Sequence, residues 1–216
     1  MKVGLIGLGK LGLPLALLMA RHFRVYGVDV NEERIRSINE NQRFLEPQVN
    51  EYLSRYRTHL KFSTSYEILE DCDIVFVITQ TPSMPDGKFD LRYVKSAVQK
   101  LHKINPECLV VISSTINIGD MDKLRKIHER IAYNPEFIRQ GSIIKDFNNP
   151  KFVIIGAYSK QDGEKVAEIW RKIHNKPIYI VKPVEAEIIK LGLNFSFTLA
   201  ISFANAMGEI CERFNA

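Results

Sequence analysis

Three glycines near the N-terminus have the spacing of a phosphate-binding loop. Gly7, Gly9 and Gly12 form a G-x-G-x-x-G pattern between a short apolar run and a run with helical periodicity. The first glycine makes a tight turn, the second lets the backbone approach a pyrophosphate, and the third lets helix and strand pack closely. The free N–H groups of the helix N-terminus then attract the anion. The stretch therefore predicts a dinucleotide site.

A carboxylate follows where such a site needs one. Asp29 ends the second apolar run, at the position where a carboxylate accepts hydrogen bonds from the hydroxyls of the adenine ribose. A carboxylate repels a 2′-phosphate, so Asp29 favours NAD over NADP as the cofactor. Arg34, one helical turn further on, is the feature that weighs against this preference.

Three later segments carry unusual chemistry directly after apolar runs. Their sequences are TQTPSMPDGKFD (79–90), SSTINIG (113–119) and NPEFIRQGSIIKDFNNP (134–150). Ligands of open α/β sheets bind beyond the carboxyl ends of the strands, so the three segments are expected to line one crevice. Taken singly, Ser113 and Ser114 are explained equally well as turn or N-cap residues.

The elements that must position these residues alternate along the chain. Apolar runs predict strands at 2–7, 23–29, 59–64, 72–79, 108–115, 130–134, 151–157 and 177–182. Helical periodicity predicts helices from the glycine loop to about residue 22, at 31–41, 90–104, near 118–130, at 159–174, and from 185 to the end. This alternation predicts a doubly wound, mostly parallel α/β sheet of Rossmann type, followed by one long C-terminal helix.

Composition excludes several other classes. The 216 residues are 45% apolar and 25% charged, as in a soluble globular protein, and the apolar runs look too short or too charged for a membrane segment. The net charge of +5 is scattered, without the basic stripe of a nucleic-acid-binding protein. Three distant cysteines indicate a reducing cytoplasm rather than a disulfide framework. The five histidines stand singly, so no metal site is expected.

In its combination of motifs the sequence resembles the UDP-glucose/GDP-mannose dehydrogenases, which oxidise a nucleotide sugar at C6. The resemblance runs from the first residue to the last and is carried by GLGKLGLPLA (7–16), TPSMPDGKFDL (81–91), SSTINIG (113–119), NPEFIRQG…D…NP (134–150) and EAEIIKLGLNFSFTLAISFANAMGEIC (185–211). It implies an NAD-binding Rossmann domain over residues 1–183 and the start of a long, dimerising central helix over 184–216. The family's C-terminal nucleotide-sugar domain is missing from the sequence.

The resemblance also implies roles for individual residues. NAD is expected to contact Gly7, Gly9, Lys10, Leu11, Gly12, Asp29, Arg34, Thr81, Thr115 and Glu136. The nucleotide sugar is expected to contact Phe137, Ile138, Arg139, Lys190 and Asn194. The catalytic residues are expected to be Thr115, Glu136, Lys190 and Asn194. Thr115 would hold a catalytic water, while Lys190 and Asn194 would stabilise the developing oxyanion; their spacing from Glu187 places all three on one helix face.

Some features of the family are absent or altered. Its nucleophilic cysteine lies in a GFGGxCxPKD-like motif that this sequence does not contain, and Cys72, Cys108 and Cys211 are interpreted as structural. The chain is therefore expected to bind NAD without completing the reaction. Gln140 stands where the family usually has a second glutamate, a candidate base for thioester hydrolysis. The stretch EPQV (46–49) departs from the usual EPGL.

Two alternatives remain open on sequence grounds. One is a nucleotide-binding or dimerisation module without catalysis. The other is a β-hydroxyacid dehydrogenase, which shares a similar glycine loop but has a different substrate motif in place of NPEF. The sequence does not distinguish UDP-glucose, a UDP-N-acetylhexosamine and GDP-mannose as substrates, because part of their contacts would come from the missing domain.

Overall fold

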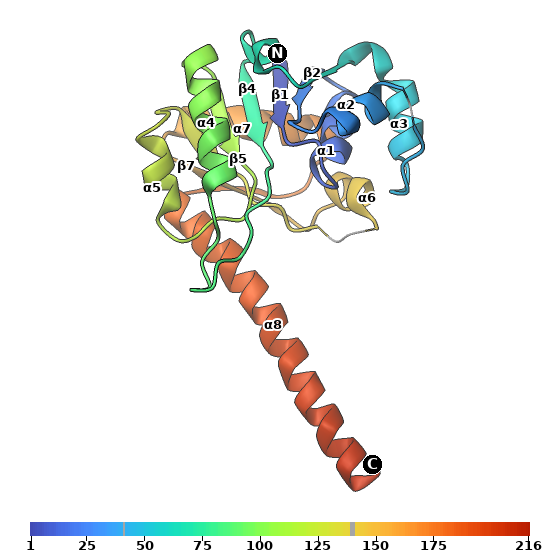
Figure 1. Ribbon diagram of the computed structural model, residues 1–216. Helices are drawn as coiled ribbons and strands as arrows, with labels where there is room; N and C mark the ends of the chain where they lie inside the picture. The colour runs from blue at the N-terminus through green and yellow to red at the C-terminus, as the bar shows by residue number, and fades with distance from the viewer. Residues whose placement is uncertain (41, 139–140) are drawn as a thin grey trace.

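The structure, a computed structural model, describes residues 1–40, 42–138 and 141–216. Its described part is an α/β body from which one long helix projects (Figure 1). The body is built around an eight-stranded sheet with the order β3-β2-β1-β4-β5-β6-β7-β8. The strands are β1 (Lys2–Ile6), β2 (Arg24–Val28), β3 (Leu60–Ser63), β4 (Ile74–Val77), β5 (Leu109–Ile112), β6 (Ile131–Tyr133), β7 (Val153–Ala157) and β8 (Ile178–Val181).

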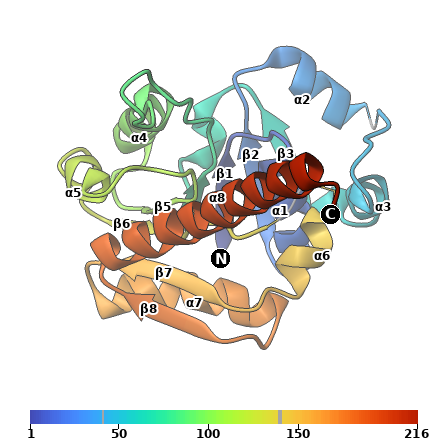
Figure 2. The ribbon, with the colours of Figure 1, turned by 90° about the horizontal axis from the view of Figure 1, so that it is seen from below.

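The sheet is doubly wound, with helices on both faces (Figure 2). The helices are α1 (Gly12–Met19), α2 (Glu32–Asn39), α3 (Val49–Arg55), α4 (Arg92–Ile104), α5 (Asp120–Arg125), α6 (Ile143–Asn148), α7 (Lys160–Ile173) and α8 (Pro183–Phe214). Two 3-10 turns lie at Arg57–His59 and Tyr66–Leu69. One core cluster lies between the sheet and α1, α3, α6 and α7, and the other lies under α4, α5 and the start of α8. The predicted α/β sheet and the long C-terminal helix are confirmed.

The strand pairings are parallel except for one. β6 pairs antiparallel with β7, with Ala132 opposite Ala157 and Tyr133 opposite Gly156. After the segment that begins at Asn134, the chain therefore runs in the direction opposite to that of β6. The carboxyl ends of β4, β5 and β6 therefore lie on one edge of the sheet, while β7 begins there.

The structure corrects the predicted helix near 118–130. α5 ends at Arg125, because the chain then turns inward to bury His128 before β6. The Nε2 atom of His128 lies 2.8 Å from the carbonyl oxygen of Cys108 at the start of β5. Helices α3 and α6, in stretches for which no helix was predicted, are seven and six residues long.

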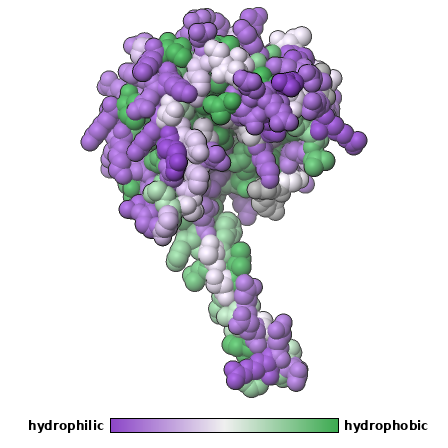
Figure 3. All heavy atoms as spheres, viewed as in Figure 1, coloured by the Kyte–Doolittle hydropathy of each residue, from purple (hydrophilic) through white to green (hydrophobic). Residues whose placement is uncertain are grey.

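α8 is 32 residues long, and most of it is exposed. Its exposed apolar side chains include Phe195, Leu199 and Phe203, and Figure 3 shows hydrophobic surface along the stretch that leaves the body. By length and composition alone, α8 is apolar enough to cross a membrane, which corrects the expectation that no apolar stretch is long enough. A helix that packs against a protein partner has the same properties.

Candidate active site

The glycine loop is a tight turn between β1 and α1. Gly7 has a φ of +96°, and its N–H donates to the carbonyl oxygen of Val28 over 2.8 Å. A Cβ atom on Gly12 would lie only 1.8 Å from the carbonyl oxygen of Gly7, so the helix start can approach the strand only without a side chain there. Gly9 has nothing within 4 Å of a built Cβ atom, which leaves this side of the loop open to a ligand.

Asp29 lies against the glycine loop from the end of β2. Its Oδ2 atom accepts from the N–H of Leu8 over 2.8 Å, and its Oδ1 atom accepts from the N–H of Asn31 over 2.9 Å. A carboxylate has about four lone-pair sites, so two remain for further donors. The carboxylate thus holds the loop in place and can still accept hydrogen bonds from ribose hydroxyls.

Arg34 is held against the same glycine loop by two contacts. Its Nε–H donates to the carbonyl oxygen of Leu8 over 2.8 Å, and its guanidinium carbon lies 5.5 Å from the ring centroid of Phe44. Asn31 caps α2 as predicted, because its Oδ1 atom accepts from the N–H of Arg34 over 2.9 Å. Arg34 is therefore held in an orientation that presents its planar group to a ligand.

A pocket of about 550 Å³ adjoins these residues. Its lining includes Gly9, Lys10, Arg34, Phe44 and Arg43. Three cations at the open side of a glycine loop suit an anion such as a pyrophosphate. On its far side the pocket reaches α6.

Glu46 joins the two walls of this pocket. Its Oε1 atom accepts from the N–H of Ile143 over 2.9 Å, so the stretch before α3 is fastened to the start of α6. Within the same EPQV stretch, Gln48 has a φ of +66°. This left-handed conformation is the one that glycine adopts at no steric cost, and the family's usual EPGL has glycine at this position.

Four buried polar atoms at the carboxyl ends of β4, β5 and β6 have no hydrogen-bond partner among the residues that the structure describes. They are Thr79 Oγ1, Ser113 Oγ, Tyr133 Oη and Glu136 Oε1. Buried polar atoms are almost always paired, so such a group indicates a place where a ligand or water supplies the partners. Thr79 and Ser113 lie in segments that were expected to line the crevice, although neither was predicted individually as a site residue.

Glu136 is the most perturbed carboxyl group at this edge. Burial raises its pKa to about 8, although nearby Lys190 opposes the shift. A cavity of about 20 Å³ beside it is also lined by Asn134, Phe152 and Trp170, and this is room for about one water molecule. At neutral pH the carboxyl group is therefore largely protonated in the folded chain.

Lys190 reaches this segment from α8. Its ammonium group donates to the main-chain oxygen of Glu136 over 2.6 Å and lies 5.1 Å from the ring centroid of Phe137. Burial lowers the pKa of Lys190, and the charge of Glu136 opposes that shift. The structure thus brings Lys190 together with Glu136 and Phe137, three residues that the sequence placed at the site.

The remaining predicted residues are distributed around the same edge. Thr81, Thr115, Phe137 and Ile138 are half-buried, whereas Asn194 lies one turn beyond Lys190 on the exposed part of α8. Arg139 and Gln140 lie outside the described residues. Glu187 does not share the surroundings of Lys190, because its carboxylate accepts hydrogen bonds at the start of α5.

The cysteines lie away from this edge. Cys72 and Cys108 precede β4 and β5, at the opposite ends of those strands, and burial raises the pKa of each thiol to about 12. Cys211 is exposed on α8, so it is not packed within this chain. In the described part of the chain, no group of three or more His, Cys, Asp or Glu side chains could hold a metal ion.

The fold and its glycine turn, with Asp29 and the row of polar strand ends, define the class of a Rossmann-type dinucleotide-binding dehydrogenase domain. Comparison with known proteins gives the family. The family model described as "UDP-glucose/GDP-mannose dehydrogenase family, NAD binding domain" matches residues 1–174. The chain belongs to this family and carries its NAD-binding domain, and a β-hydroxyacid dehydrogenase is therefore not supported.

Individual relatives agree with this assignment. The chain is 32% identical to the UDP-glucose 6-dehydrogenase of Rickettsia bellii, over 100% of this chain and 53% of that enzyme. A GDP-mannose dehydrogenase structure from Pseudomonas aeruginosa superposes with a TM-score of 0.90 at 29% identity, covering 98% of this chain and 53% of that one. A UDP-D-ManNAc dehydrogenase structure from Pyrococcus horikoshii gives 0.93 at 26% identity, covering 100% and 55%. The chain thus spans about half the length of these relatives.

Proposed function

We propose that this chain is the NAD-binding half of a nucleotide-sugar 6-dehydrogenase. The reaction would oxidise the C6 alcohol of a UDP-sugar or GDP-mannose to a carboxylate, with two hydride transfers to two NAD molecules. The observation that carries the proposal is the contact of Lys190 with the segment of Glu136, at the same sheet edge as the unpaired polar atoms of Thr79 and Ser113. A cation, a carboxyl group and hydroxyls at this edge suit a reacting alcohol.

The proposed cofactor site runs along the carboxyl edge of the sheet. The glycine loop with Lys10, Leu11, Asp29 and Arg34 would hold the adenine half and the pyrophosphate. Thr81 and Thr115 would lie along the nicotinamide. In this arrangement the ends of β4 and β5 face the reacting part of the cofactor.

The proposed substrate site lies beside the nicotinamide. Phe137, Ile138 and Arg139 would contact the nucleotide sugar, and Lys190 and Asn194 would stabilise the oxyanion. A removed donor of this kind typically raises the barrier by roughly 3–4 kcal/mol. Thr115 and Glu136 would hold the water that releases the acid.

A thioester intermediate needs an accessible thiolate near the nicotinamide. Cys72 and Cys108 are buried at the opposite strand ends and have raised pKa values, so neither suits that role. We therefore expect this chain to bind NAD without carrying the oxidation through to the acid. A nucleotide-binding module without catalysis is the second candidate. The lack of a suitable thiol in Cys72 and Cys108 favours it as well.

The test is binding and turnover by the 216-residue chain. Thermal unfolding should shift upward with NAD and much less with NADP, because Asp29 repels a 2′-phosphate. UDP-glucose, a UDP-N-acetylhexosamine and GDP-mannose should each give no sustained NADH formation. No shift with NAD would contradict the proposal. Stabilisation by NAD with no effect of any nucleotide sugar on NAD affinity would favour the non-catalytic module.

The domain division and the assembly are proposals as well. Residues 1–183 would form the cofactor domain, and residues 184–216 would begin a helix that pairs with a second copy of the chain in a homodimer. The support is the row of exposed apolar side chains on α8. A cytoplasmic location is proposed because Cys72 and Cys108 are free thiols.

A further inference from the structure

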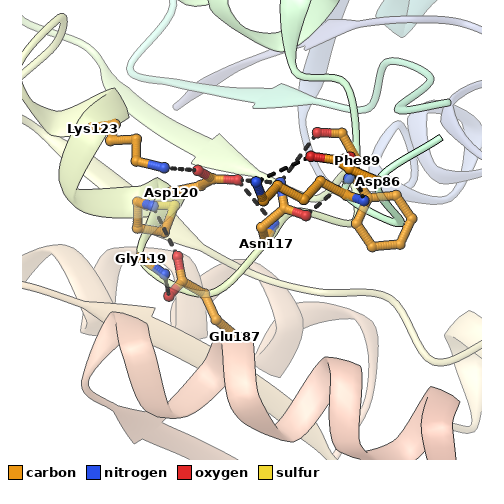
Figure 4. Close-up of polar contacts among 9 residues, drawn as sticks. Asp86, Phe89, Asn117, Gly119, Asp120, Lys123 and Glu187 are labelled. Atoms are coloured by element: carbon orange, nitrogen blue, oxygen red, sulfur yellow. Dashed lines mark hydrogen bonds and ion pairs between the residues drawn. The ribbon is translucent and has the colours of Figure 1, made fainter. Parts of the chain in front are cut away.

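Glu187 is a buried carboxylate in the second turn of α8. Its Oε2 atom accepts from the N–H of Gly119 over 2.7 Å, and its Oε1 atom accepts from the N–H of Met121 over 2.8 Å (Figure 4). These amides belong to the N-terminus of α5, whose N-cap residue is Gly119 and has no side chain to cap them. A carboxylate from a distant helix thus satisfies the orphan donors of α5.

Asp120 continues this network on the other side of the turn. Its Oδ2 atom accepts from the N–H of Asn117 over 3.0 Å and from its Nδ2 atom over 2.6 Å, while its Oδ1 atom accepts from Lys123 over 2.7 Å. Asp120 is itself buried. The turn between β5 and α5 is therefore held on one side by Glu187 and on the other by Asp120.

Asn117 links the turn before α5 to the segment that follows β4. Its Oδ1 atom accepts from the N–H of Phe89 over 2.8 Å, and its Nδ2 atom donates to the carbonyl oxygen of Phe89 over 3.1 Å (Figure 4). The amide side chain thus pairs with the backbone of Phe89 much as a neighbouring strand would. Phe89 forms an antiparallel bridge with Ser83, so the whole hairpin at 83–89 is tied to the turn.

Both anchor points lie close to the proposed nicotinamide contacts. Asn117 is two residues after Thr115, and Ser83 is two residues after Thr81. In the next turn of α8, Lys190 holds the main-chain oxygen of Glu136. One stretch of α8 therefore makes contacts that reach three loops at the carboxyl edge of the sheet.

We infer that Glu187 is a positioning residue that sets the loops of Thr115 and Thr81 against the nicotinamide half of NAD. The inference rests on the proposed function, which supplies the nicotinamide side of the site. The adenine half is expected at β1 and β2, next to Asp29 and Arg34, which the network does not include. Loss of the Glu187 contacts should therefore weaken binding of the nicotinamide half selectively.

The test compares NAD with ADP-ribose, which has the adenine half and the pyrophosphate but no nicotinamide. Glu187→Gln keeps the shape of the side chain but replaces one acceptor oxygen with an amino group that cannot accept the N–H of Gly119 or Met121. By isothermal titration calorimetry on the 216-residue chain, we expect the Kd of NAD to rise about tenfold, the effect of one buried unpaired donor, with the Kd of ADP-ribose unchanged.

Two further variants make the test decisive. Asn117→Ala leaves the Glu187 contacts in place but removes the side-chain contacts of Asn117 with Phe89 and Asp120, so it should also weaken NAD more than ADP-ribose. If circular dichroism shows that Glu187→Gln does not fold, the result for Asn117→Ala alone tests the inference. Glu209→Gln makes the same change on an exposed part of α8 and should alter neither Kd.

The outcomes separate this inference from the proposed function. The inference would be overturned if the folded variants bind NAD with the same Kd as the wild-type chain. Equal weakening of both ligands would also overturn it, because that result shows a structural role only. Failure of the wild-type chain to bind NAD would overturn the proposed function first.

Discussion

Gly9 and Gly12 stand three residues apart, yet their surroundings predict different results for the same substitution. A methyl group on Gly9 meets no protein atom within 4 Å, so Gly9→Ala should leave the free energy of unfolding nearly unchanged. The methyl group would occupy the side from which the pyrophosphate approaches. We expect the Kd of NAD to rise about tenfold or more, measured by calorimetry.

Gly12→Ala serves as the contrasting variant. Its methyl group would meet the carbonyl oxygen of Gly7, and relief requires α1 to move away from β1. The expected cost is about 1–3 kcal/mol of unfolding free energy, measured by chemical denaturation. A Gly9→Ala chain that loses as much stability as Gly12→Ala would contradict this assignment.

Glu136 predicts a pH dependence of stability. Burial raises its pKa to about 8 in the folded chain, whereas the unfolded chain releases the proton near the ordinary value of 4.5. Between these values the folded chain binds more protons, so the contribution of Glu136 to stability falls as pH rises. Glu136→Gln stays neutral throughout and should gain stability over the wild-type chain between pH 5 and pH 8, by roughly 2–4 kcal/mol.

The measurement for Glu136 is urea denaturation of both chains at several pH values. Glu46→Gln is a suitable control, because it makes the same change at a half-exposed carboxylate that accepts a main-chain hydrogen bond. A stability difference between Glu136→Gln and the wild-type chain that does not change with pH would contradict the raised pKa.

Among the elements, α7 contacts the start of the segment that contains Glu136. The indole N–H of Trp170 donates to Asn134 Oδ1 over 2.8 Å, and Asn134 Nδ2 donates to the carbonyl oxygen of Ile154 over 3.0 Å. Trp170→Phe leaves the buried Asn134 oxygen without this donor. We expect a loss of about 1–3 kcal/mol in unfolding free energy by denaturation, while Tyr179→Phe at the exposed position of β8 should have almost no effect.

The start of α3 carries a backbone conformation that the residue type does not favour. Gln48 has a φ of +66°, and a left-handed conformation costs a non-glycine residue about 1–2 kcal/mol. Glycine relieves this cost. It also makes the unfolded chain more flexible, which lowers the unfolding free energy by about 0.4–1 kcal/mol. Gln48→Gly should therefore raise the melting temperature modestly, and a lower melting temperature would show that the Gln48 side chain contributes stabilising contacts.

At the scale of the whole molecule, α8 predicts assembly. Phe195, Leu199 and Phe203 recur every four residues, share one face of the helix and are all exposed. Burying this face in a homodimer would remove apolar surface from water. By sedimentation velocity we expect the wild-type chain to be a dimer and Phe195→Ser/Phe203→Ser to be a monomer that still binds NAD.

Thr198→Ala changes an exposed position near this face without adding a polar group, so it should stay dimeric. A wild-type chain that sediments as a monomer would contradict the homodimer. A chain that stays in solution only with detergent would instead favour a membrane for α8, which its length and composition allow.

The sequence by itself determined the class of fold and the position of the cofactor loop. The strand and helix periodicities, the spacing of Gly7, Gly9 and Gly12, and the N-cap of Asn31 depend on residues close together in the chain. The family resemblance likewise pointed to the segments of Thr81, Thr115 and Glu136. Local spacing carries this information because each of these elements forms from neighbouring residues.

Only the tertiary structure decided which side chains meet. The reversal of β7, the early end of α5 and the unpaired hydroxyls of Thr79 and Ser113 depend on contacts between distant segments. Glu187 shows the reason most clearly. Its spacing from Lys190 predicted a shared helix face, but its carboxylate turns to amides 66 and 68 residues earlier in the chain. Helical spacing sets where a side chain begins, whereas the packing of α8 on β6 and β7 decides which donors it can reach.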